Sequence, residues 1–237
     1  MDGNRIITTG NKYDCRKANG VDMKLGPYEL NTIVTGDARE LAKAIPDESV
    51  DLIFTDPVYD RIDDYRWLAE TAARVLKPKK SVLAFCGHSY QILAGAAMIG
   101  KLRPGPILEH YIAGAIARLF SHSLQCNLIP CLWFSKGIPD NKWMFVQQLS
   151  IPKGRRGHKW GKAEMMAYTR LLSFTDKNDT VVDFFAGGGT IPTVCKLLQR
   201  NFLAFEIDVS AANLARQRIR EAPVMLPMAI PEQMELL

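Results

Sequence analysis

Short apolar runs that alternate with helix-like patterns are the feature that most limits how this chain can fold. Such alternation is typical of a mainly parallel sheet, because a crossover between parallel strands needs a connection about as long as a helix. We expect strands at 30–34, 50–55, 81–86, 180–185 and 202–207, and helices at about 38–45, 65–76, 163–174 and 191–198. The fold class predicted is therefore α/β.

The middle of the chain interrupts this alternation. From about Gly100 to Gly161, prolines, aromatic residues and basic residues mix with less regular apolar segments. Segments 126–134 and 143–151 are expected to form paired strands there. We predict an N-terminal arm at 1–27 and a single domain at 28–237, with a specialised region at about 100–157.

Composition limits the class of protein. The 237 residues are 47% hydrophobic, enough for one substantial core, and the net charge of +5 permits a phosphate-rich partner without requiring one. The five cysteines are scattered without a Cys-x-x-Cys pair, and the histidines form no compact ligand pattern, so neither disulfides nor a metal site is predicted. No apolar run approaches membrane-spanning length. A cytoplasmic protein without a membrane partner is expected.

The segment Asp56-Pro57-Val58-Tyr59 follows the expected strand 50–55 directly. In an open α/β sheet, ligands bind beyond the carboxyl ends of the strands. There Asp56 can accept hydrogen bonds from an amine, the Pro57 carbonyl can accept another, and Tyr59 offers a face for stacking. An ordinary turn that ends the strand is the alternative interpretation.

A glycine-rich turn joins the strand 180–185 to the following helix. Gly187 and Gly189 allow a ligand to approach the backbone, and Glu206 comes about 20 residues later, a separation typical of sites that bind ribose hydroxyls. No Gly-Lys-Ser/Thr follows, so a nucleoside is favoured over a polyphosphate. Asp37 follows another strand and is expected either to contact the base of the ligand or to cap the next helix; both roles are compatible.

Together these segments resemble the amino-directed, S-adenosylmethionine-dependent DNA methyltransferases, specifically the group in which the catalytic motif precedes the cofactor motif. Their catalytic Asp/Asn/Ser-Pro-Pro-Tyr/Phe is matched by Asp56, Pro57 and Tyr59, with Val58 in place of the second proline. Their cofactor segment, approximately Asp-Pro-Phe-Ala-Gly-Ser-Gly-Thr, is matched at 183–190 except at Phe184 and Gly188. Their His-Pro-x-x-Lys-Pro is matched only at His158 and Lys162.

The resemblance implies a Rossmann-like, mostly parallel twisted sheet flanked by helices, with 100–157 as the target-recognition region. It implies methyl transfer from S-adenosylmethionine to a base that is flipped out of DNA. Asp56, Pro57 and Tyr59 are the predicted catalytic residues. The predicted cofactor residues are Asp37, Ala38, Lys162, Asp183, Phe185, Gly187, Gly189, Thr190 and Glu206, and the predicted DNA contacts are Lys153, Arg155, Arg156 and Lys159.

Several alternatives stay open. Adenine is the favoured target because the catalytic motif begins with Asp; cytosine N4 is the main alternative, and RNA is a further substrate to test. A catalytically weak protein that binds cofactor and DNA is another interpretation, motivated by Val58 and the altered lysine motif. Pro130-Cys131 resembles the cysteine motif of cytosine ring-carbon methyltransferases, although a buried core cysteine is the simpler interpretation. The recognition sequence, a homodimer and a companion restriction enzyme are left undecided.

Overall fold

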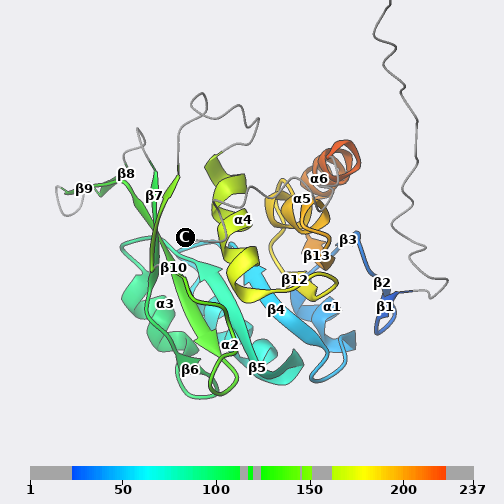
Figure 1. Cartoon of the computed structure of the whole chain (residues 1–237), viewed down its shortest axis with the longest axis horizontal. Coiled ribbons are helices and arrows are strands. Elements are labelled where there is room, and N and C mark those ends of the chain that lie inside the picture. The colour runs from blue at the N-terminus through cyan, green and yellow to red at the C-terminus, as the bar shows by residue number, and fades with distance from the viewer. Residues whose placement is uncertain (1–22, 113–116, 120–123, 145, 151–161, 223–237) are drawn as a thin grey trace, which may run out of the picture.

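The computed structural model describes residues 23–112, 117–119, 124–144, 146–150 and 162–222. In this part of the chain, a nine-stranded sheet lies between helices on both of its faces (Figure 1). The strand order is β11-β7-β10-β5-β4-β12-β13-β3, with β6 beside β10. Its strands are β3 (Thr32–Thr35), β4 (Val50–Thr55), β5 (Leu76–Phe85), β6 (Arg103–Pro104), β7 (Leu108–Ile112), β10 (Leu128–Ser135), β11 (Gln147–Ser150), β12 (Thr180–Asp183) and β13 (Asn201–Glu206).

The sheet has a parallel half and a mixed half. Strands β5, β4, β12, β13 and β3 all run parallel to one another. Beyond β5, β10 is antiparallel to β5, β7 is antiparallel to β10, and β11 runs parallel to β7. This arrangement confirms the predicted fold class, and it brings the carboxyl ends of the parallel strands to one edge.

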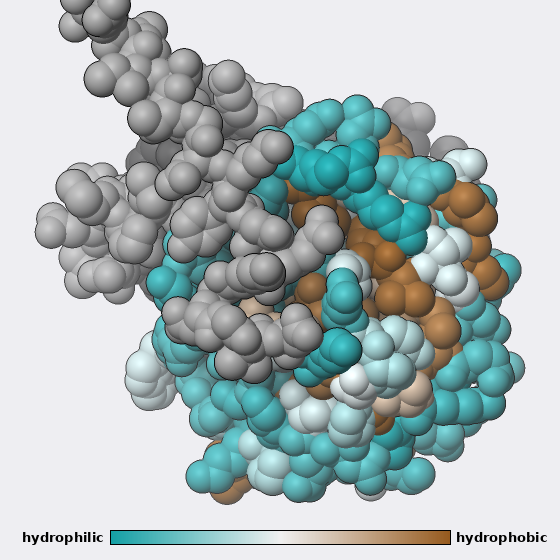
Figure 2. All heavy atoms as spheres, turned by 90° about the vertical axis from the view of Figure 1, so that its right-hand side faces the viewer, coloured by the Kyte–Doolittle hydropathy of each residue, from teal (hydrophilic) through white to brown (hydrophobic). Residues whose placement is uncertain are grey.

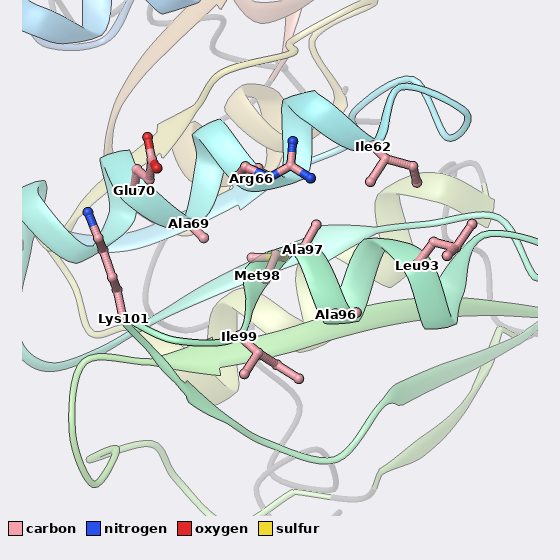
Figure 3. A pocket seen from close by; sticks show the side chains of 10 residues that line it. All are labelled: Ile62, Arg66, Ala69, Glu70, Leu93, Ala96, Ala97, Met98, Ile99 and Lys101. Carbon is pink, nitrogen blue, oxygen red and sulfur yellow. The ribbon is translucent and has the colours of Figure 1, made fainter.

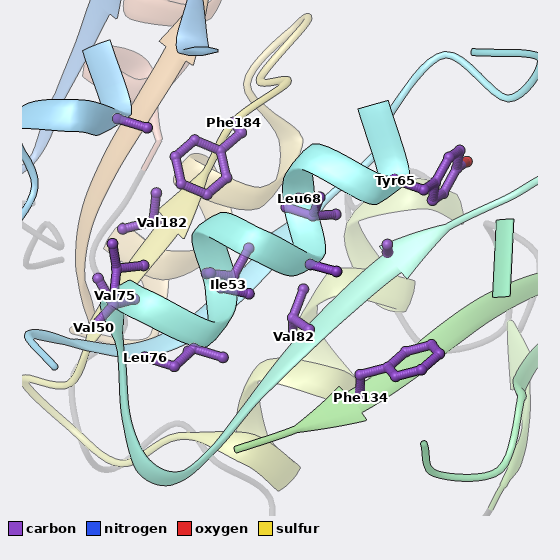
Figure 4. Close-up of a cluster of buried hydrophobic side chains, with 14 of the residues drawn as sticks. Val50, Ile53, Tyr65, Leu68, Val75, Leu76, Val82, Phe134, Val182 and Phe184 are labelled. Atoms are coloured by element: carbon purple, nitrogen blue, oxygen red, sulfur yellow. The ribbon is translucent and has the colours of Figure 1, made fainter. Parts of the chain in front are cut away.

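Helices cover the two faces of the sheet and form a core on each. One core packs helix α2 against the strands, where Leu68 and Val75 lie near Val50, Ile53 and Val82 (Figure 4). The other core joins the opposite face to residues of α4, α5 and α6. None of the described helices is both long and apolar enough to span a membrane. The helices are α1 (Ala38–Leu41), α2 (Ile62–Val75), α3 (Gln91–Met98), α4 (Lys162–Phe174), α5 (Thr190–Leu197) and α6 (Val209–Glu221), and a 3-10 turn (Ala42–Ala44) extends α1.

Two small hairpins accompany the main sheet. Strand β1 (Lys24–Leu25) pairs with β2 (Tyr28–Glu29), so this hairpin crosses the predicted arm boundary at residue 27, and Leu25 is buried in the core. Strand β8 (Ala117–Leu119) pairs with β9 (Leu124–Cys126) inside the predicted recognition region. Residues 1–22 of the predicted arm lie outside the described residues.

The sequence predictions succeed best in the parallel half. β4 has the predicted bounds, and all six of its residues are buried, including the polar Asp51 and Thr55. The prediction that segments 126–134 and 143–151 pair was wrong: β10 and β11 form there, but β7 lies between them. Helices α3 and α6 were not predicted.

Candidate functional site

Neighbouring strand ends bring the predicted carboxylates to one edge of the sheet. β13 lies between β3 and β12, and β12 lies beside β4, all in parallel. Asp183 and Glu206 are the last residues of their strands, whereas Asp56 directly follows β4 and Asp37 follows β3 after one glycine. The structure therefore gathers predicted catalytic and cofactor residues from four segments that are far apart in sequence.

The glycine turn between β12 and α5 requires glycine at two of its positions. Gly187 has φ +47° and Gly189 has φ +74°, both in the left-handed region. A Cβ at Gly189 would lie 2.7 Å from the Cβ of Ala215 on α6, whereas a Cβ at Gly187 would have no heavy atom within 4 Å. Gly189 is therefore required for packing against α6, and Gly187 leaves open space in which a ligand can approach the backbone.

Backbone amides hold the Glu206 carboxylate in place beside this turn. Its Oε2 accepts a hydrogen bond from the Gly187 amide at 2.7 Å, and its Oε1 accepts one from the Asp208 amide at 2.8 Å. Each carboxylate oxygen can accept a further hydrogen bond. The half-buried carboxylate is thus oriented in advance to accept hydrogen bonds from a pair of hydroxyl groups.

Asp37 caps the first helix. Its side chain accepts a hydrogen bond from the Arg39 amide at 2.9 Å, so the capping role considered for this residue is confirmed. The Gly36 amide also donates to the Glu206 backbone carbonyl at 2.9 Å, which ties the ends of β3 and β13 together. Asp37 remains exposed and Ala38 is buried, so a ligand at this position would meet the carboxylate of Asp37 rather than the side chain of Ala38.

Asp183 supports the glycine turn from below. The hydroxyl of Thr55 donates to Asp183 Oδ1 at 2.7 Å, and the Phe185 amide donates to both of these oxygens, at 3.1 Å and 3.2 Å. Burial raises the pKa of Asp183 to about 7, although the hydrogen bonds oppose that shift. Sequence reasoning missed Thr55; the available signal was a hydroxyl at the end of an otherwise apolar strand. This pair connects β4, where the catalytic segment starts, to the turn.

Two of the departures from the family pattern, Val58 and Phe184, do not disturb the local fold. Val58 is 50% exposed, so its side chain requires no space in the core. Phe184, which replaces a proline, is buried, stacks on Phe205 at 5.8 Å between ring centroids and meets the edge of Trp67 at 5.1 Å. Phe185 is only partly buried and lies nearer the turn surface.

Asp56 and Tyr59 contact each other directly after β4. Solvent reaches Asp56, but surrounding protein atoms remove part of its hydration and raise the pKa of its carboxyl, an effect that the hydrogen bond with Tyr59 opposes. The Tyr59 ring rests on Gly87, where an added Cβ would come within 3.0 Å of the ring. Gly87, which follows β5 and Cys86, therefore sets the position of the predicted stacking ring.

Cys131 is unsuited to a nucleophilic role. It is buried within β10, where it pairs with Phe85, and burial raises the pKa of its thiol. A thiol attacks as a thiolate, so a buried cysteine with a raised pKa is unreactive. The simpler interpretation of Pro130-Cys131, a core cysteine, is the one that agrees with this geometry.

The predicted basic residues fall largely outside the described part of the chain. Lys153, Arg155, Arg156 and Lys159 lie in the segment 151–161, which is not described. Lys162 begins α4, but its side chain is also outside the description. Glu164, one turn into the same helix, pairs with Arg218 of α6. Thr190, the remaining predicted cofactor residue, begins α5 and accepts a hydrogen bond from Arg218 at 3.1 Å.

Apolar surface adjoins the site on the side of α6. Figure 2 shows apolar side chains gathered among hydrophilic ones on this face of the molecule. Ile207, directly after Glu206, is 70% exposed, and Val209 is also exposed. Sequence reasoning did not single out Ile207, an exposed apolar side chain next to the oriented carboxylate.

A separate groove of about 480 Å³ lies between α2 and α3 (Figure 3). Leu93, Ala97, Met98 and Ile99 give it apolar walls, and Arg66, Glu70 and Lys101 lie at its rim. Its lining includes none of the predicted catalytic or cofactor residues. This groove is therefore separate from the predicted site at the strand ends.

Comparisons with known proteins agree with the site. A family model described as DNA methylase, of the N6/N4 type, matches residues 132–217, which include the glycine turn and Glu206 but not Asp56. The type II methyltransferase M.HinfI of Haemophilus influenzae is 29% identical over 81% of this chain and 69% of its own length. The DNA adenine methyltransferase YhdJ of Escherichia coli is 26% identical over 81% of this chain and 83% of its own.

Solved structures share the fold. M1.HpyAVI in complex with SAM aligns with a TM-score of 0.66 at 21% identity, over 79% of this chain and 98% of that one. The cytosine-N4-specific PvuII DNA methyltransferase aligns with a TM-score of 0.69 at 17% identity, over 85% and 88%. Sequence motifs, relatives and fold agree, and the predicted resemblance to the amino-directed, S-adenosylmethionine-dependent DNA methyltransferases is confirmed.

Proposed function

We propose that this protein methylates the exocyclic N6 of adenine in DNA, in the cytoplasm, and that the reaction takes place at Asp56. The observation that carries the proposal is the position of Asp56. Its carboxylate directly follows β4, forms a hydrogen bond with the Tyr59 side chain, and lies one residue after Thr55, whose hydroxyl donates to Asp183 before the glycine turn. Asp56 as the acceptor for an amine and Tyr59 as the stacking ring are therefore proposed to lie beside the cofactor site.

The cofactor site is proposed at the ends of β3, β13 and β12. The oriented carboxylate of Glu206 fits the two ribose hydroxyls, and the open space at Gly187 permits close approach to the backbone. Asp37 and Ile207 would contact the adenine ring, one by hydrogen bonding and the other by apolar contact. Lys162 is proposed to pair with the carboxylate of the methionine end. When bound, S-adenosylmethionine supplies an electrophilic methyl group.

The protein is proposed to accelerate methyl transfer mainly by positioning the reacting groups and by electrostatic stabilisation. The lone pair of an aromatic amino group is delocalised into its ring, and hydrogen bonds accepted by the Asp56 carboxylate and the Pro57 carbonyl favour a localised, nucleophilic nitrogen. Holding that nitrogen in line with the methyl carbon lowers the barrier further. The proton that methylation makes acidic leaves to Asp56 or to water.

DNA is proposed to bind along the predicted recognition region at about 100–157. A base within a duplex cannot reach Asp56, so the target must be flipped out and stacked on Tyr59. Lys153, Arg155, Arg156 and Lys159 are proposed to hold phosphates nearby, since lysine and arginine neutralise the DNA backbone. Residues 28–237 are proposed to form one catalytic domain, with 1–27 as an arm.

The choice of adenine rests on the aspartate at the first catalytic position and on the relative YhdJ, which is named a DNA adenine methyltransferase. Cytosine N4 is the second candidate, because a cytosine-N4-specific methyltransferase shares the fold. Incubation with labelled S-adenosylmethionine and varied DNAs, followed by nucleoside mass spectrometry, separates the two.

N6-methyladenine that is absent with Asp56→Ala supports the proposal, and N4-methylcytosine alone would transfer support to the second candidate. RNA is included as a further substrate. Bound cofactor without a methylated product on any single- or double-stranded nucleic acid would instead indicate a binding protein.

A further inference from the structure

Arg218 on α6 joins the glycine turn to the first turn of α4. Its Nη1 donates to the Gly188 carbonyl and to the Thr190 hydroxyl, both at 3.1 Å. Its Nη2 donates to Glu164 Oε1 at 2.8 Å, in an ion pair whose side chains are 35% and 20% exposed. One guanidinium therefore contacts the cofactor turn, the start of α5 and the start of α4.

Helix α6 holds the turn at a second point, one turn earlier. Ala215 packs directly under Gly189, where the close approach leaves no space for a side chain. The Gly188 carbonyl belongs to the same peptide group as the Gly189 amide, and that amide donates to the Ala186 carbonyl at 2.8 Å. The contact with Arg218 thus fixes the orientation of the peptide group in the middle of the turn.

We propose that Arg218 is a positioning residue for the methionine end of S-adenosylmethionine. Through Glu164 it holds the first turn of α4, which begins at Lys162, against the glycine turn that is proposed to approach the cofactor. The inference rests on the proposed function, because it takes Lys162 as the partner of the cofactor carboxylate. Arg218 acts through these groups and does not itself touch the cofactor.

The geometry explains why arginine is needed here. A guanidinium presents several donors in a rigid plane, so it can contact a carbonyl, a hydroxyl and a carboxylate at once. A lysine keeps the charge but is a single point donor, and it would retain only part of this arrangement. The partial burial of the ion pair with Glu164 reduces its screening by solvent.

The test compares inhibition of methyl transfer by two probes. S-adenosylhomocysteine carries the amino-acid end of the cofactor, whereas 5′-methylthioadenosine carries only the nucleoside half. With Arg218→Met, we expect inhibition by S-adenosylhomocysteine to weaken about tenfold, the loss of one well-placed charged contact. Inhibition by 5′-methylthioadenosine should change less than about twofold, and KM for the cofactor should rise while kcat stays within about threefold.

Matched variants separate positioning from general stability. Arg218→Lys should recover part of the affinity, and Arg220→Met, which removes an exposed charge from the same helix, should match the wild type. Glu164→Gln should also weaken inhibition by S-adenosylhomocysteine. The Arg218→Met/Glu164→Gln double variant should be inhibited as strongly as Arg218→Met alone, because Glu164 is proposed to act through Arg218.

Equal weakening of both probes, or an unchanged KM for the cofactor in Arg218→Met, would overturn the inference. A wild-type protein that neither binds S-adenosylhomocysteine nor transfers a methyl group would instead refute the proposed function. Urea unfolding of each variant shows whether it is folded. If Arg218→Met does not fold, Arg218→Lys and Glu164→Gln are used for the test in its place.

Discussion

The two halves of the sheet edge are built differently. On the proposed cofactor side, hydrogen bonds hold three groups: Glu206 accepts from two backbone amides, Asp183 accepts from Thr55, and Arg218 bridges the turn and α4. On the target side, β10 and β7 are added to β5 as antiparallel strands. There the Tyr59 ring rests on Gly87 and contacts Asp56, and both Tyr59 and Asp56 remain accessible to solvent.

The proposed cofactor site is held by hydrogen bonds that join separate strands and helices, whereas Asp56 and Tyr59 of the proposed target site are exposed to solvent. The carboxyl ends of parallel strands lie at one edge of the sheet, so the residues after them meet although they are far apart in sequence. In the mixed half, the buried Arg170 of α4 donates to the Val146 carbonyl at 2.9 Å and to the Glu109 carbonyl at 3.3 Å. The comparison predicts that the two halves can be disabled separately.

The largest effect should come from the catalytic segment. Asp56→Ala removes the proposed acceptor of the amine, and methyl transfer should fall by about a thousandfold or more, as for other groups that stabilise a transition state. Asp56→Asn keeps one acceptor oxygen and should retain more activity. Single-turnover rates on methylatable DNA measure both, and an Asp56→Ala variant with nearly normal rates would remove Asp56 from the reaction.

The support beneath the glycine turn should make stability depend on pH. Because the pKa of Asp183 is raised to about 7 by burial, the folded state binds this proton more tightly than the unfolded state. Stability from this group is therefore complete below about pH 4 and is lost as pH rises toward 7, by roughly 4 kcal/mol if the shift from the ordinary carboxyl pKa is complete.

Asp183→Asn resembles the protonated form and should remove this slope. Urea unfolding between pH 4 and 8 gives the free energy of unfolding of the wild type and of the variant. The difference between the two removes the contribution of other titrating groups, which both proteins share. Parallel curves for the two proteins would show that Asp183 is not the group responsible.

The glycine turn itself should tolerate substitution at only one of two adjacent positions. Gly189→Ala places a Cβ 2.7 Å from Ala215 at a left-handed φ, and should cost about 2 to 3 kcal/mol. Gly188→Ala meets nothing closer than 3.8 Å and should change stability by less than about 0.5 kcal/mol. Thermal unfolding compares the stability of the two variants. Equal losses of stability would contradict the packing of the turn on α6.

The smallest effect is expected for the hydroxyl of Tyr59. Tyr59→Phe keeps the ring on Gly87 and loses only the hydrogen bond to Asp56, so kcat should stay within about threefold of the wild type. Tyr59→Ala removes the stacking ring and should lower the rate of methyl transfer to DNA about tenfold or more. This is the range found for base stacking on aromatic residues. If the two variants lose equal activity, the hydroxyl rather than the ring carries the function.

The same comparison explains what could be predicted from the sequence. β4 and the positions of the carboxylates follow from local patterns, namely mostly apolar runs and the residues at or directly after their ends. The roles of Thr55 and Arg218 were not predicted. Their partners, Asp183 and Gly188, are 128 and 30 residues away, and no local sequence pattern indicates such contacts.

The mixed half was harder for the same physical reason. Segments 126–134 and 143–151 were correctly expected to contain strands, but strand pairing is decided by tertiary packing, and β7 takes the place between them. Val58 was a doubtful departure in the sequence, and its exposure explains why the turn accepts a valine.

The central claim is that cofactor binding and target chemistry occupy adjoining but separable parts of one strand edge. Titration calorimetry with S-adenosylhomocysteine on the wild type, Asp56→Ala and Glu206→Gln tests it most directly. We predict a Kd within about twofold of the wild type for Asp56→Ala and at least about tenfold weaker binding for Glu206→Gln. Equal weakening in both variants, or wild-type affinity in Glu206→Gln, would contradict the account.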